Sequence, residues 1–363
     1  MPFLVTWRRL FIAIAAIGAG GLLFAWSGLF NIAASGGHWA ITDWFLHWVM
    51  QNSVRTYSMT IETPDLSNAG LVHRGAGHYE TGCAPCHGSP SDPQDLSVAQ
   101  ATPPPPTLNH VNEKWQPKHL FWIVKHGIKY TGMPAWVALK REDEIWAMVA
   151  FLREQPSMSA EGYRELAFGD VKIQQMQGDS AEKLLSDCAR CHGRDGAGRD
   201  NDAFPLIGGQ SEAYLSDALL AYANGSRHSG MMQPAARRGT ASDLAVVASH
   251  YASQRSAATK QALDPALVTA GERIARDGIP GEGVPACLTC HGAVPRLRNP
   301  SLPRLDGQHA TYLLSQLLAW KNGGRGGGPY EHLMRAIAQR LSDDEAVAAS
   351  QYFASQPAMG THR

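Results

Sequence analysis

The sequence of 363 residues contains one short pattern three times: Cys83-Ala-Pro-Cys86-His87, Cys188-Ala-Arg-Cys191-His192 and Cys287-Leu-Thr-Cys290-His291. These stretches use all six cysteines of the chain. With 6 Cys and 15 His in the sequence, chance would produce such a pattern only about 0.004 times. We therefore interpret its threefold occurrence as functional, and the spacing of about 100 residues between copies indicates one domain for each.

The residue types in this pattern point to one kind of chemistry. Two cysteines three positions apart, followed at once by histidine, are typical of covalent c-type haem attachment, in which the thiols add to the haem vinyl groups and the histidine ligates the iron. Zinc sites usually need four ligands from closely placed pairs, and disulfides leave the histidine unexplained. The sequence thus predicts three haem c groups, held by the pairs Cys83 and Cys86, Cys188 and Cys191, and Cys287 and Cys290, with His87, His192 and His291 as iron ligands.

A methionine follows each motif at a similar distance, 39 to 46 residues after the histidine, and is the predicted sixth ligand. The candidates are Met133 in the first domain, where Gly132 and Pro134 indicate a loop, and Met334 in the third, which is also expected in a loop. In the second domain Met231 and Met232 both qualify, and Met232 is preferred. Ligation by His and Met leaves no open position on the iron and raises its potential, as an electron carrier requires. The other histidines are interpreted as surface or loop residues, with a second histidine ligand as the alternative.

The second and third domains are internal repeats. Residues 205–227 match residues 303–325 at a constant offset of 98. Alignment of the ends of the two domains places Met334 opposite Met232, which is the reason for preferring Met232 over its neighbour.

Proline precedes the middle helix of every domain and suggests how the histidines are oriented. The first domain has four prolines at 103–106, and the others have Pro205 and Pro303 at corresponding places. Since proline has no backbone N–H, its segment leaves carbonyl groups available to accept the Nδ1 hydrogen bond of a ligand histidine. We expect Pro105 or Pro106, Pro205 and Pro303 to accept these bonds.

The N-terminus contains a long apolar run. Residues 10–34 carry no charged side chain, and a helix rising about 1.5 Å per residue over this length spans the roughly 30 Å hydrocarbon layer. A cleaved signal peptide is the alternative, but the run exceeds the usual apolar core of about 7–15 residues, so we expect a retained anchor. Arg8 and Arg9 precede the run and the next Lys or Arg is Arg55, which places the rest of the chain in the periplasm.

An amphipathic helix is predicted directly after the anchor. Its apolar stripe repeats at i, i+3, i+4, i+7 and i+8, and consists of Ile41, Trp44, Phe45, Trp48 and Val49. Such a helix lies in the lipid headgroup layer or packs on the first haem domain or a partner subunit, and both alternatives stay open.

Composition excludes one class of partner. The 32 Lys+Arg balance 32 Asp+Glu, so the whole chain has no electrostatic basis for binding nucleic acid. The 36 Gly and 22 Pro indicate small domains with long ordered loops.

The chain after residue 65 resembles a run of three class I cytochrome c domains. The last two resemble cytochrome c4 through Gly209-Gln210, Tyr214-Leu215 and the Asn-Gly-x-Arg stretch at 224–227. The first, through residues 120–136, resembles cytochrome domains of membrane dehydrogenases and haem-copper oxidases. The third departs from the pattern in an inserted glycine-rich segment at 324–328.

The resemblance implies an all-α fold of three class I cytochrome c domains in tandem after one N-terminal transmembrane helix. The expected divisions are an anchor at 1–35, an amphipathic juxtamembrane segment at 36–64, and haem domains at 65–158, 170–258 and 264–359.

The expected function is electron transfer in a periplasmic respiratory chain by a protein anchored in the inner membrane. A membrane dehydrogenase or terminal oxidase is expected to be its redox partner or the complex of which it is a subunit. The alternative is a haem enzyme of the cytochrome c peroxidase type, which requires one methionine ligand to be absent and one haem to be open.

Overall fold

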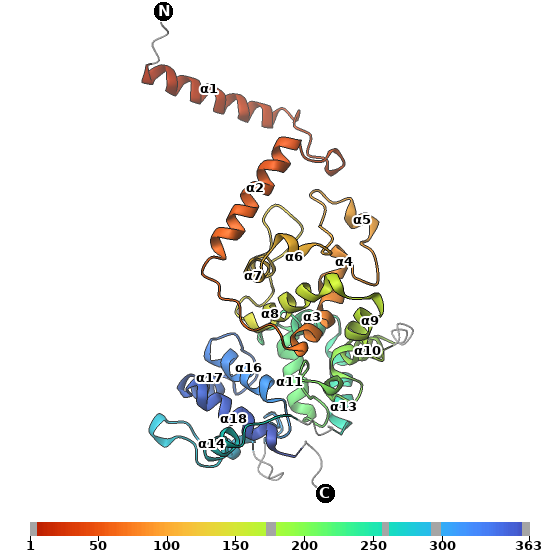
Figure 1. Ribbon diagram of the computed structural model, residues 1–363, viewed down its shortest axis with the longest axis vertical. Helices are drawn as coiled ribbons and strands as arrows, with labels where there is room; N and C mark the ends of the chain where they lie inside the picture. Colours follow the sequence, from red (N-terminus) through yellow and green to blue (C-terminus); the bar gives the residue numbers. More distant parts are fainter. Residues whose placement is uncertain (1–5, 172–178, 256–260, 292–298, 358–363) are drawn as a thin grey trace, which may run out of the picture.

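The computed structural model describes residues 6–171, 179–255, 261–291 and 299–357. Over these residues the regular structure is helical, apart from one isolated bridge between Ile279 and Val284 (Figure 1). The predicted all-α fold is thus confirmed. The expected domain ends at residues 258 and 359 lie outside the described residues.

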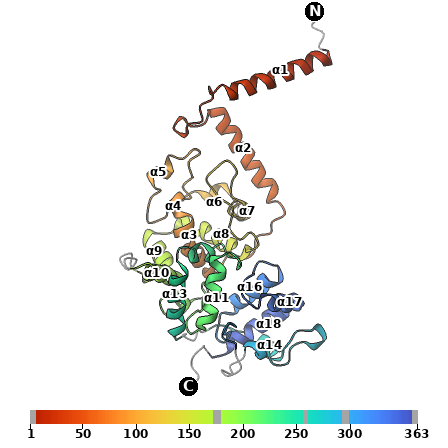
Figure 2. The same ribbon diagram turned by 180° about the vertical axis from the view of Figure 1, so that it is seen from behind.

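The N-terminal segment consists of two helices that stand away from the body of the protein (Figures 1 and 2), with a short turn between them: α1 (Trp7–Trp26), η1 (Ala34–Gly36) and α2 (Ala40–Tyr57). Helix α1 has 20 residues, a mean hydropathy of 1.8 and no buried residue, and within the described ranges it is the one helix long and apolar enough to cross a membrane. The expectation that one helix extends to residue 34 is wrong. Ser27 caps α1, and Gly28 then adopts a φ of 75°, a left-handed conformation that glycine takes without strain.

Helix α2 has two different halves. The five side chains of the predicted apolar stripe, residues 41–49, are all exposed. Further along, Val54 is fully buried in the core of the first haem-motif unit, and Met50 packs against the same core. The stripe therefore does not pack on this unit, whereas the end of the helix does.

Three helical units follow, each with its own hydrophobic core. The first unit contains the first motif and a core centred on Tyr79, Ile145 and Phe151. Its helices are α3 (Ala69–Gly82), α4 (Ala84–His87), α5 (Leu96–Ala99), α6 (Val111–Lys114), α7 (Pro117–His126), α8 (Glu142–Glu154), η2 (Gln155–Ser157) and α9 (Ala160–Phe168). Helix α3 crosses α8 and packs against α9.

The second unit is smaller, and its core centres on Leu184, Val247 and Tyr251. Its helices are α10 (Ser180–His192), η4 (Gly198–Asp200), α11 (Glu212–Ala223), α12 (Met232–Ala236) and α13 (Ala241–Ser253). Helix α10 contains the whole second motif and ends at its histidine, His192.

The third unit repeats the plan of the second, with helix α14 crossing α18. Its helices are α14 (Pro265–Asp277), η5 (Pro280–Glu282), α15 (Leu288–His291), α16 (Ala310–Lys321), α17 (Glu331–Arg340) and α18 (Asp343–Ser355). The expected loop around Met334 is a helix instead. The glycine-rich segment separates α16 from α17, and a Glu331–Arg335 ion pair bridges the first turn of the new helix.

A glycine permits the close crossing of the outer helices in the third unit. A Cβ built on Gly271 of α14 would collide with the carbonyl oxygen of Ala348 and lie 2.8 Å from the Cβ of Tyr352, both on α18. The two helices therefore approach each other at backbone distance.

We predict that Gly271→Ala lowers the free energy of unfolding of the third unit by about 1–3 kcal/mol, because the added methyl group forces α14 and α18 apart. This outweighs the higher helix propensity of alanine, which alone would stabilise α14 by about 1 kcal/mol. Thermal unfolding of the holoprotein measures the difference. Gly281→Ala is the matched control, since nothing lies within 4 Å of its Cβ, and equal melting temperatures for the two variants would contradict the prediction.

Candidate functional site

Each cysteine motif forms a single helical turn. The backbone N–H of His87 donates to the carbonyl of Cys83 at 2.9 Å, and that of His291 donates to Cys287 at 2.9 Å. In the second unit the turn is the end of α10. The first cysteine and the histidine are thus four residues apart on one helix face, and none of the six cysteines forms a disulfide.

The motif histidines have the same hydrogen bond in all three units, and the proposed proline carbonyls accept it. The Nδ1 atom of His87 lies 2.8 Å from the oxygen of Pro106. The corresponding distances are 3.2 Å from His192 to Pro205 and 2.9 Å from His291 to Pro303. The expectation from the sequence is confirmed at each position.

The structure also distinguishes the two candidate prolines of the first unit. The oxygen of Pro105 accepts a hydrogen bond from the Gln94 amide at 2.9 Å, and the same amide donates to the carbonyl of Cys86. Pro106 is therefore the partner of His87. A ring that donates from Nδ1 to a carbonyl carries its lone pair on Nε2, which is the tautomer that a metal ligand needs.

Met133 lies in a loop, as expected. Its carbonyl accepts a hydrogen bond from the N–H of Ile128 at 3.2 Å, and its own N–H donates to Oγ1 of Thr131 at 3.1 Å. Gly127 opens this loop with a φ of 63°, and a Cβ there would lie within 2.6 Å of Pro134. The side chain of Met133 is half-buried.

The two consecutive methionines of the second unit pack on different cores. Met231 packs against the core of the first unit, whereas Met232, the first residue of α12, packs against the core of the second unit. This arrangement favours Met232 as the residue available to the second haem site. The half-buried Met334 lies on α17 of the third unit, in the helix that replaces the expected loop.

The second and third units are joined by two equivalent pairs of hydrogen bonds. Gln308 accepts from the N–H of Leu206 at 3.0 Å and donates to its carbonyl at 2.8 Å. Gln210 makes the same pair with Arg304, at 3.0 and 2.7 Å. Leu206 and Arg304 directly follow the prolines that accept from the ligand histidines, so this contact joins the two haem sites almost directly.

A cluster of two arginines, Arg227 and Arg325, lies beside this contact. Its surroundings indicate whether the residues here suit a haem group. Arg227 is 4% exposed, and its guanidinium lies over the Tyr222 ring and near the hydroxyls of Tyr214 and Tyr312. Arg325 donates to Gln316 at 2.7 Å, while its buried Nε has no partner. Within the described part of the chain neither guanidinium pairs with a carboxylate.

The electrostatics of this cluster indicate an anionic ligand. Burial and the neighbouring Arg227 lower the pKa of Arg325. Burial opposes ionisation of Tyr214, but the two guanidiniums outweigh it and lower the pKa of its hydroxyl to about 8. A buried cation (Arg227) and a half-buried one (Arg325) without a carboxylate partner are costly, and the propionate groups of haem are carboxylates that would balance them. The residues present therefore fit the cofactor.

The first and second units meet at the second motif itself. A Cβ on Gly77 of α3 would lie 3.0 Å from Sγ of Cys191. Arg190, inside the motif and 2% exposed, donates to the carbonyls of Gly77 at 3.0 Å and Ala167 at 3.1 Å, and pairs with Asp187. The second haem site is thus in contact with both other units.

Two histidines expected at the surface are buried instead, where the units meet. His73 hydrogen-bonds to Asn201 at 2.7 Å and its ring packs on Phe204, while burial and the Arg199 guanidinium lower its pKa to about 4. His309 is 1% exposed, and neither ring nitrogen has a hydrogen-bond partner. Contacts between units, which sequence periodicity does not reveal, account for both positions.

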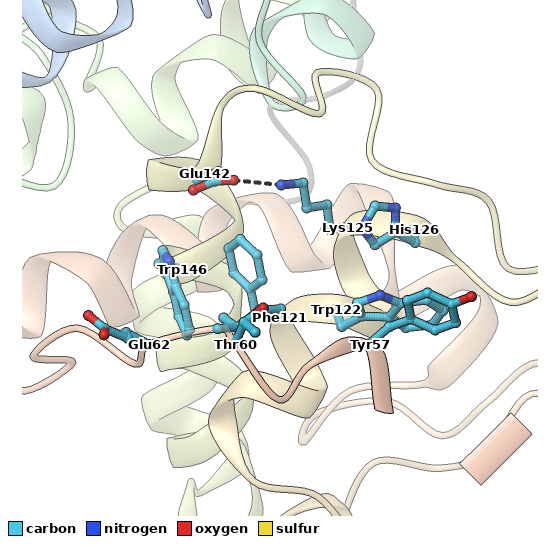
Figure 3. A pocket seen from close by; sticks show the side chains of 10 residues that line it. Tyr57, Thr60, Glu62, Phe121, Trp122, Lys125, His126, Glu142 and Trp146 are labelled. Carbon is cyan, nitrogen blue, oxygen red and sulfur yellow. Dashed lines mark hydrogen bonds and ion pairs between the residues drawn. The ribbon is translucent and has the colours of Figure 1, made fainter. Parts of the chain in front are cut away.

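Two cavities lie away from the motifs. One of about 470 Å³ lies between the end of α2 and helices α7 and α8, with Trp122, Tyr57 and Trp146 around it and the Lys125–Glu142 ion pair at 2.5 Å on its edge (Figure 3). The other, of about 520 Å³, lies in the third unit between η5 and α17.

Sequence reasoning missed several of these residues. The internal repeat contains four of them: Gln210, Gln308, Arg227 and Arg325. Their recurrence was a signal that could have found them, but it did not reveal their role. Arg190 occupies a variable position of the motif and carried no signal.

Comparison with known proteins identifies the relatives of this chain. Residues 70–152 match the family model described as "Cytochrome C oxidase, cbb3-type, subunit III". The thiosulfate dehydrogenase electron acceptor of Thiomonas intermedia is 33% identical over 179 residues, 49% of this chain and 82% of that protein. Cytochrome c4 of Pseudomonas aeruginosa is 33% identical over 190 residues, 52% of this chain and 93% of that protein.

Solved structures of similar proteins include reduced cytochrome c4 from Pseudomonas stutzeri, with 31% identity, a TM-score of 0.43, and coverage of 50% of this chain and all of that one. The thiosulfate dehydrogenase of Marichromatium purpuratum has 36% identity, a TM-score of 0.43, and coverage of 48% of this chain and 38% of that one. Cytochrome c4 and the thiosulfate dehydrogenase electron acceptor are electron carriers, which favours electron transfer over the peroxidase alternative. The chain belongs to the cytochrome c4 family of electron-transferring c-type cytochromes.

Proposed function

We propose that this chain is a membrane-anchored triheme cytochrome c that transfers electrons in a periplasmic respiratory chain, between a dehydrogenase and a terminal oxidase. The observation that carries the proposal is the hydrogen bond from the motif histidine to a proline carbonyl, which recurs in all three units at 2.8 to 3.2 Å. When bound, each haem supplies a one-electron iron couple.

We assign the following roles to the site residues. The cysteine pairs Cys83 and Cys86, Cys188 and Cys191, and Cys287 and Cys290 hold the three haem groups as thioethers. His87, His192 and His291 would ligate iron through Nε2, and Met133, Met232 and Met334 would supply the sixth ligands. Arg227 and Arg325 balance the propionates between the second and third sites. Ligation by both His and Met would leave no position on the iron for a substrate.

The contacts between units support an electron path through the second site. Gly77 of the first unit lies against Cys191, and the Gln210 and Gln308 bonds join the histidine-orienting segments of the other two units. In this arrangement the second site would be the intermediate between the third site and the first.

The relatives suggest the partners at the two ends. Two of them are electron acceptors of thiosulfate dehydrogenases, and the model that matches the first unit describes an oxidase subunit. We infer a periplasmic dehydrogenase as donor to the second and third units, and an oxidase as acceptor at the first.

The ligand assignment in the second unit makes a clear prediction. Met232→Ala should open one iron, so that the reduced holoprotein binds carbon monoxide at one haem and the midpoint potential of that haem falls, because thioether ligation favours ferrous iron. Met231→Ala is the matched control and should change neither property. If Met231→Ala opens an iron and Met232→Ala does not, the assignment is reversed.

The anchor assignment is tested on native membranes. The full chain should stay in the membrane fraction through washes with concentrated salt and alkaline carbonate, because the apolar part of the 20-residue helix α1 is held by the hydrocarbon layer and not by charge. A variant in which a cleavable signal peptide replaces residues 1–35 should be soluble. Release of the native chain by carbonate, with an N-terminus downstream of α1, would instead indicate signal cleavage.

A further inference from the structure

Glu144 of the first unit is a buried carboxylate in direct contact with the second unit. It lies on α8 and is 3% exposed. Its Oε1 accepts a hydrogen bond from Oγ of Ser229 at 2.5 Å, and its Oε2 accepts from the N–H of Gly230 at 2.6 Å. Both donors belong to the short segment that leads into Met232, so a side chain of one unit holds the methionine segment of another.

Ser229 connects the carboxylate to Met232. Its hydroxyl oxygen accepts hydrogen bonds from the N–H of Met232 at 2.9 Å and of Met231 at 3.3 Å while it donates to Glu144. The side chain of Gln233 accepts from the N–H of Ser229 at 2.9 Å and closes this turn. Only one hydroxyl group therefore separates Glu144 from the backbone of Met232.

Other first-unit residues complete the contact. The indole N–H of Trp136 donates to Oε2 of Glu144 at 3.3 Å, and the Trp136 ring lies so close to Gly230 that a Cβ there would be 2.7 Å from Cζ2. Arg141 pairs with Glu144 at 3.1 Å and donates to the carbonyl of His228 at 3.1 Å. Residues 228–230 are thus held from the first unit at three successive positions.

The packing of the two methionines shows which haem site this contact affects. Met231 packs on the first core and Met232 on the second. A shift of residues 229–230 would therefore move Met232 relative to the core in which it is seated. In a cytochrome, the position of the sixth ligand decides both the iron–sulfur bond and the potential.

We propose that Glu144 is a positioning residue for the second haem site: through Ser229 and Gly230 it fixes the segment that presents Met232, so that the first unit sets the axial ligation of a haem held by the second. The inference rests on the proposed function, because it takes Met232 as the sixth ligand. A carboxylate is suited to the task since it accepts from both donors, whereas an amide has one acceptor oxygen for the two.

The test uses the full-length holoprotein with Glu144→Gln and Ser229→Ala. In the ferric protein, methionine–iron bonds give rise to an absorption band in the red. Either change should weaken this band by at most the contribution of one haem. It should also shift one of the three midpoint potentials. The double variant should change little beyond the larger single effect, because both residues act on one path. Glu142→Gln is the matched control, since Glu142 lies two positions earlier at the exposed start of α8 and should leave the band and all midpoints unchanged.

Two backgrounds identify the affected haem. In Met133→Ala the Glu144→Gln change should still weaken the band, whereas in Met232→Ala it should have no further effect. Ser229→Ala removes one buried hydroxyl and serves as the decisive variant where Glu144→Gln does not fold.

The outcomes separate the two hypotheses. One outcome would overturn the positioning role alone. In it, the folded Ser229→Ala protein keeps the band and all three midpoint potentials, while the Met232→Ala protein loses the contribution of one haem to the band. An unchanged band in Met232→Ala would overturn the ligand assignment on which it rests.

Discussion

The hydrogen bond from histidine Nδ1 to a proline carbonyl is the constraint around which each unit is arranged. It fixes the tautomer of the ring and its rotation about the Cβ–Cγ bond, so Nε2 points in one direction. The histidine is four residues from the first cysteine in one helical turn, which ties that direction to the thiol. The proline segment must therefore lie within hydrogen-bonding distance of the end of the motif helix in every unit.

The sites were more predictable than the contacts between units, for a physical reason. A motif that fits within one helical turn, such as residues 83–87, has its geometry determined by local hydrogen bonds, so spacing alone is informative. A proline carbonyl is also readable, because the missing N–H is a property of the residue. Glu144 offered no such signal: it stands in an acidic run that resembles an ordinary first turn of a helix, and its partners Ser229 and Gly230 are more than 80 residues away.

Local chain geometry explains the other differences between expectation and structure. The apolar run at 10–34 predicted a single helix, but hydropathy is insensitive to the left-handed turn at Gly28 that ends it at Trp26. The predicted Met334 loop is a helix because the glycine-rich stretch before it absorbs the change in chain direction. Burial of His73 and His309 depends on side chains of neighbouring units, which no periodicity within one unit can indicate.

Helix α2 is rigidly joined to the first unit at one end, where Val54 is buried, and leads to α1 at the other (Figure 2). Its 18 residues measure about 27 Å. With α1 in a bilayer, helix α2 would restrict the first unit to a limited range of distances from the lipid surface. Encounter with a membrane-bound acceptor then becomes a search in two dimensions, and its rate follows the surface density of the two proteins rather than their concentration in the periplasm.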